Sequence, residues 1–327
     1  MKMKITGTGS SLPQKQVDNT DLMKWMDTSD EWIRERTGIA SRRISTGETV
    51  ASMAASACSK ALEQSGKRAE DVDMILLATC SPEYALPCSA CQVQALIGAD
   101  NAVAFDINAA CAGFLFGLVT ANAYIKSGMY RNILVVGSEV LSKIMDWSDR
   151  STCILFGDGA GAVMAEASEE GDSELIFSMQ GSDGAGGMVL ACRDRMISNP
   201  FYNERDGEKE ESLFVQMDGQ AVYRFATRQV TECIREALAG ADWSVEDVDL
   251  FVLHQANLRI IEAVAKRLKA GKEKFPVNVD RLGNMSSATI PVLLDELNRE
   301  GRLNRGDKLI LSGFGAGLTY GACALIW

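Results

Sequence analysis

The stretch EDVDMILLATC, residues 70–80, recurs in altered form as EDVDLFVLHQA at residues 246–256. In both copies an acidic turn leads into an apolar run rich in Ile, Leu and Val. The offset is 176 residues, and the same offset places ILVVG, residues 133–137, on LILSG, residues 309–313. A constant offset shared by two separate motifs is the mark of an internal repeat. We therefore predict that the chain is a diverged duplication.

The two copies indicate an α/β fold. Continuous runs of Val, Ile and Leu that alternate with helical segments are typical of sheets covered on both faces. No Pro- or Ser-rich linker separates the copies, so we expect two halves, residues 1–170 and 171–327, packed as one body about a pseudo-two-fold axis. The charged stretch NERDGEKEESLF, residues 203–214, is predicted to be a solvated excursion within the second half.

Composition excludes several classes of protein. The net charge of −11 argues against a nucleic-acid partner bound through a general basic surface. The first residues contain no apolar run of the length that a secretory signal needs. The apolar segment 107–125 contains Asn108 and Asn122, which favours a buried helix over a membrane span. Nine cysteines without a leader indicate free thiols in a reducing compartment, so we expect a cytoplasmic protein with no membrane contact.

One pair of cysteines, Cys88 and Cys91, has C-x-x-C spacing. A redox pair or half of a metal site is one interpretation. No second C-x-x-C follows, and the single histidine of the chain, His254, is far away in sequence. We favour small residues packed at the start of a helix that opens with Pro87, and we expect no metal site.

Another cysteine has a more suggestive setting. Cys111 lies in NAACAGFLFG, residues 108–117, just before a segment predicted to be helical. The unpaired amides and the dipole at a helix N-terminus stabilise a thiolate, so we expect an activated nucleophile. The alanines and glycines on both sides leave room for a substrate to approach the backbone.

The repeat indicates where this cysteine lies in the fold. The 176-residue offset places Cys111 on Ser287, in RLGNMSSATIP, and two equivalent segments meet near a pseudo-two-fold axis. His254 follows the second apolar run, and Asn284 lies just before Ser287. Each residue alone also has an ordinary structural interpretation. Together they predict that Cys111, His254 and Asn284 converge at a pocket between the halves.

These motifs resemble those of the β-ketoacyl-[acyl-carrier-protein] synthase III family, and the resemblance extends from ITGTGSSLP, residues 5–13, to FGAGLTYGA, residues 314–322. The motifs between these ends are DTSDEWIRERTGI (27–39), DINAACAGF (106–114), FGDGAGA (156–162), HQANLRII (254–261) and DRLGNMSSATIP (280–291). The resemblance implies a thiolase-like fold and an acyltransferase that catalyses decarboxylative Claisen condensation. A CoA-linked starter acyl group, acetyl or another short acyl, and malonyl-acyl-carrier protein would give 3-ketoacyl-carrier protein, CO2 and CoA at the start of fatty-acid synthesis.

The resemblance also assigns catalytic roles. Cys111 would take the acyl group as a thioester. His254 and Asn284 would donate hydrogen bonds to the thioester oxygen of malonyl-carrier protein while CO2 leaves. The backbone N–H groups of Cys111 and of Ala316, where a third consecutive glycine is frequent in the family, would hold the second oxyanion. No metal or redox cofactor is implied, and acyl-CoA is a substrate.

Further residues would contact substrates and partners. By the same resemblance Trp32 and Arg150 would enclose the CoA adenine, Arg36 would meet its phosphates, and Gly219 and Asn257 would touch the pantetheine arm. The helix after His254 carries a basic patch for the acidic carrier protein, formed by Arg259, Lys266 and Arg267. The family is homodimeric, and Leu86 would line the acyl tunnel across the dimer interface, where an aromatic residue is common.

The residue counts narrow the family, and three alternatives stay open. A single histidine excludes condensing enzymes that need two. Degradative thiolases use a second catalytic cysteine and hydroxymethylglutaryl-CoA synthases use a glutamate, and neither matches Asn284. The remaining Cys-His-Asn set is shared with the chalcone-synthase group. One alternative is therefore a secondary-pathway relative with another starter or with malonyl-CoA. The others are a nucleotide-binding oxidoreductase, suggested weakly by GTGS at residues 7–10, and a non-catalytic thiol protein built around Cys88 and Cys91.

Overall fold

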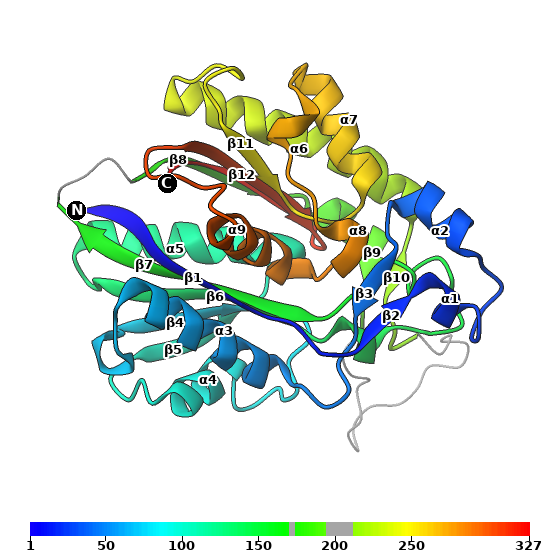
Figure 1. Ribbon diagram of the computed structural model, residues 1–327, viewed down its shortest axis with the longest axis horizontal. Helices are drawn as coiled ribbons and strands as arrows, with labels where there is room; N and C mark the ends of the chain where they lie inside the picture. The colour runs from blue at the N-terminus through cyan, green and yellow to red at the C-terminus, as the bar shows by residue number, and fades with distance from the viewer. Residues whose placement is uncertain (170–173, 194–211) are drawn as a thin grey trace.

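The computed structural model describes residues 1–169, 174–193 and 212–327. Within these ranges the chain forms two large mixed sheets that are stacked face to face with helices between them (Figure 1). The first sheet has the order β1 (Lys2–Ser11), β7 (Gly159–Ser168), β6 (Asn132–Glu139), β4 (Met74–Ala78) and β5 (Val103–Ile107). The second has the order β8 (Glu174–Ser182), β13 (Thr319–Ile326), β12 (Lys308–Gly315) and β11 (Leu250–Leu253).

Helices form three layers around these sheets. In the centre, α5 (Gly113–Ser127) and α9 (Thr289–Arg299) lie between the sheets (Figure 1). The outer face of the first sheet carries α3 (Val50–Ser65) and α4 (Ser89–Ile97), and that of the second carries α6 (Gly219–Ala241) and α7 (Leu258–Leu268). Phe114 and Leu115 of α5 are completely buried, so the segment after Cys111 anchors the central helix. The α/β prediction is confirmed.

The 176-residue offset recurs in the elements. The pairs β4 and β11, α5 and α9, and β6 and β12 each begin 176 residues apart. The order β1-β7-β6-β4 in the first sheet also matches β8-β13-β12-β11 in the second. Among the described strands of the two large sheets, β5 is the one without a counterpart. It forms one edge of the first sheet and pairs with β4.

Two predictions concern residues outside the described ranges. The proposed boundary between residues 170 and 171 falls within 170–173, so the division into halves at that point stays a prediction. Most of the charged stretch 203–214 also lies outside, since the described chain resumes at Ser212.

Short elements complete the molecule at one end (Figure 1). They are β2 (Gln16–Asp18), α1 (Asn19–Leu22), α2 (Asp30–Thr37), β3 (Ser41–Arg43), β9 (Leu190–Ala191), β10 (Gln216–Met217) and α8 (Val279–Leu282). This end forms the mouth of the main cavity. No helix in the described ranges has both the length and the apolar character needed to cross a membrane.

Candidate active site

Three chain segments bring Cys111, His254 and Asn284 to one pocket of about 700 Å³. Cys111 lies in the 3₁₀ turn Ala110–Ala112 that leads into α5, and His254 directly follows β11. Asn284 lies between α8 and the turn Ser286–Ala288 that leads into α9. All three side chains are at least nine-tenths buried and line the pocket. The predicted convergence between the two halves is confirmed.

The protonation of Cys111 differs from the sequence-based expectation. Burial raises the pKa of the Cys111 thiol to about 12, and a hydrogen bond with the Ser286 side chain offsets this only in part. The residue does lie at the N-terminal end of α5, as predicted, but desolvation is the largest influence on its pKa. The expectation of a resting thiolate was therefore wrong, because a sequence reveals a helix end more readily than the depth of burial.

His254 is held from one side of its ring. Its Nδ1 lies 2.6 Å from the Oγ1 of Thr289, the first residue of α9. Its Nε2 is buried and has no hydrogen-bond partner among the described residues. Burial lowers the pKa of His254 to about 3, so the imidazole is neutral at physiological pH. The ring meets Phe314 edge-on, with ring centroids 5.6 Å apart, which fixes its plane.

The Asn284 amide has one orientation. Its Oδ1 accepts a hydrogen bond of 2.8 Å from the backbone N–H of Ser286. Because only the oxygen can accept, Nδ2 is the group left to donate into the pocket. The backbone is fixed as well, since Asn284 N–H donates to Leu155 O at 2.8 Å and Asn284 O accepts from Gly157 N–H at 3.0 Å. A segment of the first half thus holds the asparagine of the second.

Gly315, at the end of β12, leaves open space beside the nucleophile. A Cβ at this position would lie 2.6 Å from the Cys111 backbone nitrogen and 3.1 Å from that of Ala112. Only glycine therefore keeps the Cys111 N–H accessible. Gly315 lines the pocket, whereas the predicted donor Ala316 follows it and is half-buried outside the lining. The role of the Ala316 N–H stays a prediction.

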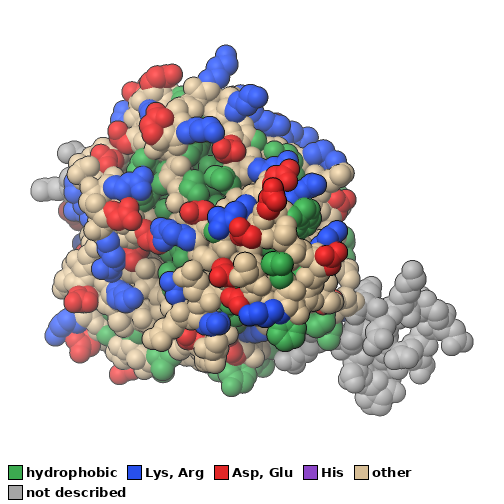
Figure 2. Space-filling model, turned by 45° about the vertical axis from the view of Figure 1, so that its right-hand side comes forward, with side chains coloured by type: hydrophobic (Ala, Val, Ile, Leu, Met, Phe, Trp, Pro, Cys, Tyr) green, Lys and Arg blue, Asp and Glu red, His purple; other side chains and the backbone are tan. Residues whose placement is uncertain are grey.

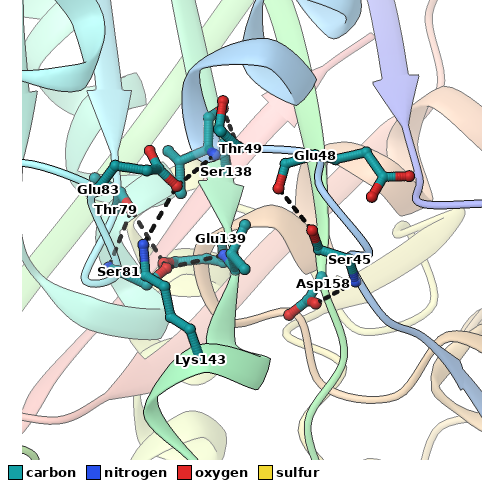
Figure 3. A network of polar contacts seen from close by, with 12 residues as sticks. Ser45, Glu48, Thr49, Thr79, Ser81, Glu83, Ser138, Glu139, Lys143 and Asp158 are labelled. Carbon is teal, nitrogen blue, oxygen red and sulfur yellow. Dashed lines mark hydrogen bonds and ion pairs between the residues drawn. The ribbon is translucent and has the colours of Figure 1, made fainter.

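A buried carboxylate near the site was not predicted from the sequence. Glu139, at the end of β6, accepts a hydrogen bond from the Ser81 hydroxyl at 2.5 Å (Figure 3). It also accepts one from the Cys80 N–H at 3.1 Å. Its Oε1 lies 2.8 Å from the Ser287 hydroxyl, which belongs to the other half. Burial raises the pKa of Glu139, and these hydrogen bonds partly offset that effect. The network joins both halves, and the Glu139 carboxylate is near enough to Cys111 to contribute to the raised pKa of its thiol.

The predicted CoA contacts lie at the mouth of the same pocket. Trp32, Arg36, Arg150, Gly219 and Asn257 all line it. The Arg150 guanidinium lies 5.1 Å from the centre of the Trp32 ring, and that of Arg36 lies 5.8 Å away. Asn257 also caps α7 by accepting from the Arg259 N–H at 2.9 Å, so its side chain has a structural role too.

The predicted basic patch follows α7. Arg259, Lys266 and Lys272 border a second hollow between α6 and α7, of about 520 Å³. Arg267 is less available, because its guanidinium donates to Thr227 O at 2.6 Å and so joins α7 to α6. In Figure 2, a row of Lys and Arg side chains follows the upper right edge of the molecule, in the layer that carries these two helices, whereas basic and acidic side chains are interspersed over the rest of the visible face.

Leu86 does not line the pocket of its own chain. It is 87% exposed and lies in the segment between β4 and α4. Three further large apolar side chains in this part of the chain, Tyr84, Leu96 and Val103, are also exposed. An unpaired edge strand and exposed apolar side chains are features that interaction surfaces share.

The C-x-x-C pair is near the β5 edge of the first sheet. Cys88 and Cys91 have sulfur atoms 3.3 Å apart, and both sulfurs approach Ala104 O of β5. The helix begins at Ser89 with Cys88 as its N-cap, two residues after Pro87, so the predicted start was slightly early. The structure, as far as it is described, has no group of three or more His, Cys, Asp or Glu side chains that could hold a metal ion.

Two stacked, repeated α/β halves with a cysteine, a histidine and an asparagine at their junction define the class of the thiolase-fold condensing enzymes. Two family models match the chain: 3-oxoacyl-[acyl-carrier-protein] synthase III over residues 105–184, and the C-terminal model of the same synthase over residues 238–327. The chain belongs to the β-ketoacyl-[acyl-carrier-protein] synthase III family of acyltransferases. The predicted family, fold and enzyme class are confirmed.

The similarity covers the whole chain. The β-ketoacyl-[acyl-carrier-protein] synthase III of Clostridium acetobutylicum is 46% identical over 99% of this chain and 98% of its own length. The crystal structure of 3-oxoacyl-[acyl-carrier-protein] synthase III from Aquifex aeolicus matches with a TM-score of 0.92 and 42% identity, over 99% of this chain and 100% of that one. The priming β-ketosynthase of a polyketide biosynthetic pathway matches with a TM-score of 0.90 and 35% identity, over 99% and 96%.

Proposed function

We propose that this protein condenses a short acyl group from acyl-CoA with malonyl-acyl-carrier protein and so begins fatty-acid synthesis. The observation that carries the proposal is the meeting of Cys111, His254 and Asn284 in one pocket, within a chain of the β-ketoacyl-[acyl-carrier-protein] synthase III family. The three side chains are at least nine-tenths buried, which limits their contact with bulk water.

In the first half-reaction, Cys111 attacks the acyl-CoA thioester. A bond forms between its sulfur and the acyl carbon, the bond to the CoA sulfur breaks, the thiol loses its proton, and the departing CoA sulfur takes one up. The Cys111 N–H, kept accessible by Gly315, stabilises the oxyanion of this step, with the N–H of Ala316 as the proposed second donor. Trp32, Arg36, Arg150, Gly219 and Asn257 bind CoA at the mouth of the pocket.

In the second half-reaction, malonyl-carrier protein enters the same pocket. Loss of CO2 places negative charge on the malonyl thioester oxygen, and donors from His254 and Asn284 stabilise it. The carbanion then attacks the acyl-Cys111 thioester, and the cysteine sulfur is released. Decarboxylation drives the condensation, so we propose that neither a metal nor a redox cofactor takes part.

Two proposals concern partners. The carrier protein docks on the basic patch of α7, where Arg259 and Lys266 border the second hollow and offer positive charge to an acidic surface.

The protein forms a homodimer through the β5 edge, which supports Leu86 of one subunit as a wall of the partner's acyl tunnel. A Leu96→Glu variant tests the dimer, because analytical ultracentrifugation should then find monomers. A dimer that survives this change would place the interface elsewhere.

All nine cysteines are thiols, which supports the cytoplasm as the site of action.

Intact-mass measurement after incubation with a panel of acyl-CoAs tests the reaction. We expect a stable acyl adduct that is absent from Cys111→Ala, and release of that acyl group as 3-ketoacyl-carrier protein when malonyl-carrier protein is added. Adducts at other residues, or none with any acyl-CoA, would falsify the assignment of the nucleophile.

A second candidate is the priming step of a secondary pathway. The 35% identity to a polyketide priming β-ketosynthase over nearly the whole chain favours keeping it. A comparison of malonyl-CoA with malonyl-carrier protein as the extender, and of acetyl with longer starters, separates the two functions.

A further inference from the structure

The hydroxyl of Thr289 contacts two groups and has one hydrogen to give. Its Oγ1 lies 3.0 Å from Ser286 O and 2.6 Å from His254 Nδ1. The carbonyl oxygen has no hydrogen, so the Thr289 hydroxyl must donate to it if that contact is a hydrogen bond. Both contacts are then satisfied only when His254 Nδ1–H donates to Oγ1. Thr289 is completely buried, so bulk water does not compete for its hydroxyl.

This arrangement determines the other side of the imidazole. A neutral ring carries one hydrogen, and a hydrogen on Nδ1 leaves a lone pair on Nε2. Nε2 is buried without a partner among the described residues, in a side chain that lines the same pocket as Cys111. The resting histidine therefore offers the pocket an acceptor rather than a donor.

The Ser286 peptide groups support both polar side chains of the site. The Ser286 N–H holds Asn284 Oδ1 at 2.8 Å, and its C=O holds the Thr289 hydroxyl. Ser286 has φ +48°, a left-handed conformation that is costly for a residue with a side chain. The same strained residue thus fixes the amide of Asn284 and, through Thr289, the tautomer of His254.

We propose that Thr289 is a positioning residue that holds the His254 hydrogen on Nδ1, so that Nε2 carries one proton from Cys111 through the catalytic cycle and back. This inference rests on the proposed function. It goes beyond that function by making the single histidine a base in the first half-reaction and a donor in the second.

The proton balance closes over one cycle. During loading, Nε2 takes the Cys111 proton, the sulfur–acyl bond forms, and the departing CoA thiolate takes a proton from solvent. During condensation, the Nε2–H donates to the malonyl thioester oxygen while CO2 leaves and the new C–C bond forms. The released Cys111 thiolate then recovers the proton from Nε2. Overall, one solvent proton is consumed and the neutral Cys111–His254 pair is restored.

The chain allows an unusually clear test, because His254 is its only histidine. In protein labelled with ¹⁵N-histidine, a nitrogen that carries hydrogen is distinguished by NMR from one that carries a lone pair. We expect the hydrogen on Nδ1 in the substrate-free protein at pH 7. Free imidazole side chains favour Nε2, so this result would reflect Thr289. A hydrogen on Nε2 in the unmodified protein would overturn the proposal.

Variants connect the tautomer to catalysis. Thr289→Val keeps the shape of the side chain but cannot accept from Nδ1, so we expect the hydrogen to move to Nε2. The rate of Cys111 acylation should fall by about 10²-fold, the lower end of what a general base contributes. Thr289→Ser should restore both the NMR signature and the rate. An unchanged acylation rate in Thr289→Val would contradict the proposal.

A matched control separates this role from the loss of a buried hydroxyl. Thr231 in α6 is equally buried, donates to Thr227 O at 2.8 Å and lies outside the pocket lining, so Thr231→Val should change neither readout. The two proposals can also fail separately. Absence of any acyl adduct in the unmodified protein refutes the proposed function, whereas an adduct together with an Nε2–H tautomer refutes only the role of Thr289.

Discussion

Ala110 and Ser286 lie 176 residues apart and have nearly the same left-handed backbone conformation, with φ values of +45° and +48°. Each begins a short 3₁₀ turn that leads into one of the two central helices. Non-glycine residues rarely adopt this conformation, and it persists only where the surrounding structure enforces it. The repeat has therefore preserved a strained turn in both halves, and the candidate nucleophile immediately follows one copy.

The alkylation of Cys111 should report its protonation. Because burial raises the pKa of its thiol to about 12, the reactive thiolate is a small fraction at neutral pH. We expect the rate of modification by iodoacetamide, followed by peptide mass spectrometry, to increase steadily from pH 7 to pH 10. A plateau below pH 8 would instead indicate a thiolate stabilised by the helix end.

Asn284→Asp should separate the two half-reactions. The carboxylate can still accept from the Ser286 N–H, but it places a negative charge where the amide donated. We expect condensation to fall by about 10²- to 10³-fold, the effect of losing one oxyanion donor, while acylation of Cys111 continues. Ketoacyl product and acyl adduct are measured on the same samples. The exposed Asn101→Asp is the control, and equal loss in both half-reactions would contradict this role.

Gly315→Ala should impair both half-reactions. The new Cβ would lie 2.6 Å from the Cys111 nitrogen, so it must displace the turn or cover the N–H. We expect a loss of at least about 10²-fold in turnover. Gly184→Ala is the matched control, since no atom lies within 4 Å of its Cβ position. Full activity in Gly315→Ala would exclude the Cys111 N–H as an oxyanion donor.

Lys266→Glu should weaken use of the carrier protein. Lys266 borders the hollow between α6 and α7 but does not line the catalytic pocket. We expect a several-fold increase in KM for malonyl-carrier protein that diminishes at high salt, with acylation by acyl-CoA unchanged. Lys126→Glu, which makes the same charge change on α5, is the comparison. A parallel effect of both variants would indicate general electrostatics rather than a docking site.

Leu86→Phe should narrow the choice of starter. Leu86 is 87% exposed in the single chain, so the change costs its own fold little. We expect activity with longer acyl-CoAs to decrease relative to acetyl-CoA, because a rigid ring takes up space in the partner's tunnel. Competition between two acyl-CoAs, resolved by adduct mass, measures this ratio. An unchanged ratio would remove Leu86 from the tunnel.

The sequence allowed the repeat, the α/β class and the meeting of Cys111, His254 and Asn284 to be predicted. These predictions depend on offsets and motifs that can be read from the sequence alone. Thr289 and Glu139 could not be identified, because a threonine at a helix start and a glutamate at a strand end are ordinary. Their importance arises from what packs against them: the imidazole in one case, and the Ser81 and Ser287 hydroxyls in the other.

The expectation of a stabilised Cys111 thiolate failed for a related reason. A helix N-terminus is visible in a sequence, whereas complete desolvation depends on residues from both halves. Ala110 and Ser286 show the same limit. The 176-residue offset between them can be read from the sequence, but neither alanine nor serine is a residue type that indicates a left-handed backbone.

Ser287, the counterpart of Cys111 in the repeat, joins the two halves. Its hydroxyl lies 2.9 Å from Ala78 O and 2.8 Å from Glu139, both at strand ends of the opposite half. One copy of the repeated turn carries the candidate nucleophile Cys111, and the other carries Ser287, which hydrogen-bonds to the opposite half. The half that carries Cys111 therefore depends on Ser287 of the other half for these hydrogen bonds. If the chain were divided between the two halves, we expect neither fragment to be active, because Cys111 would be separated from His254 and Asn284.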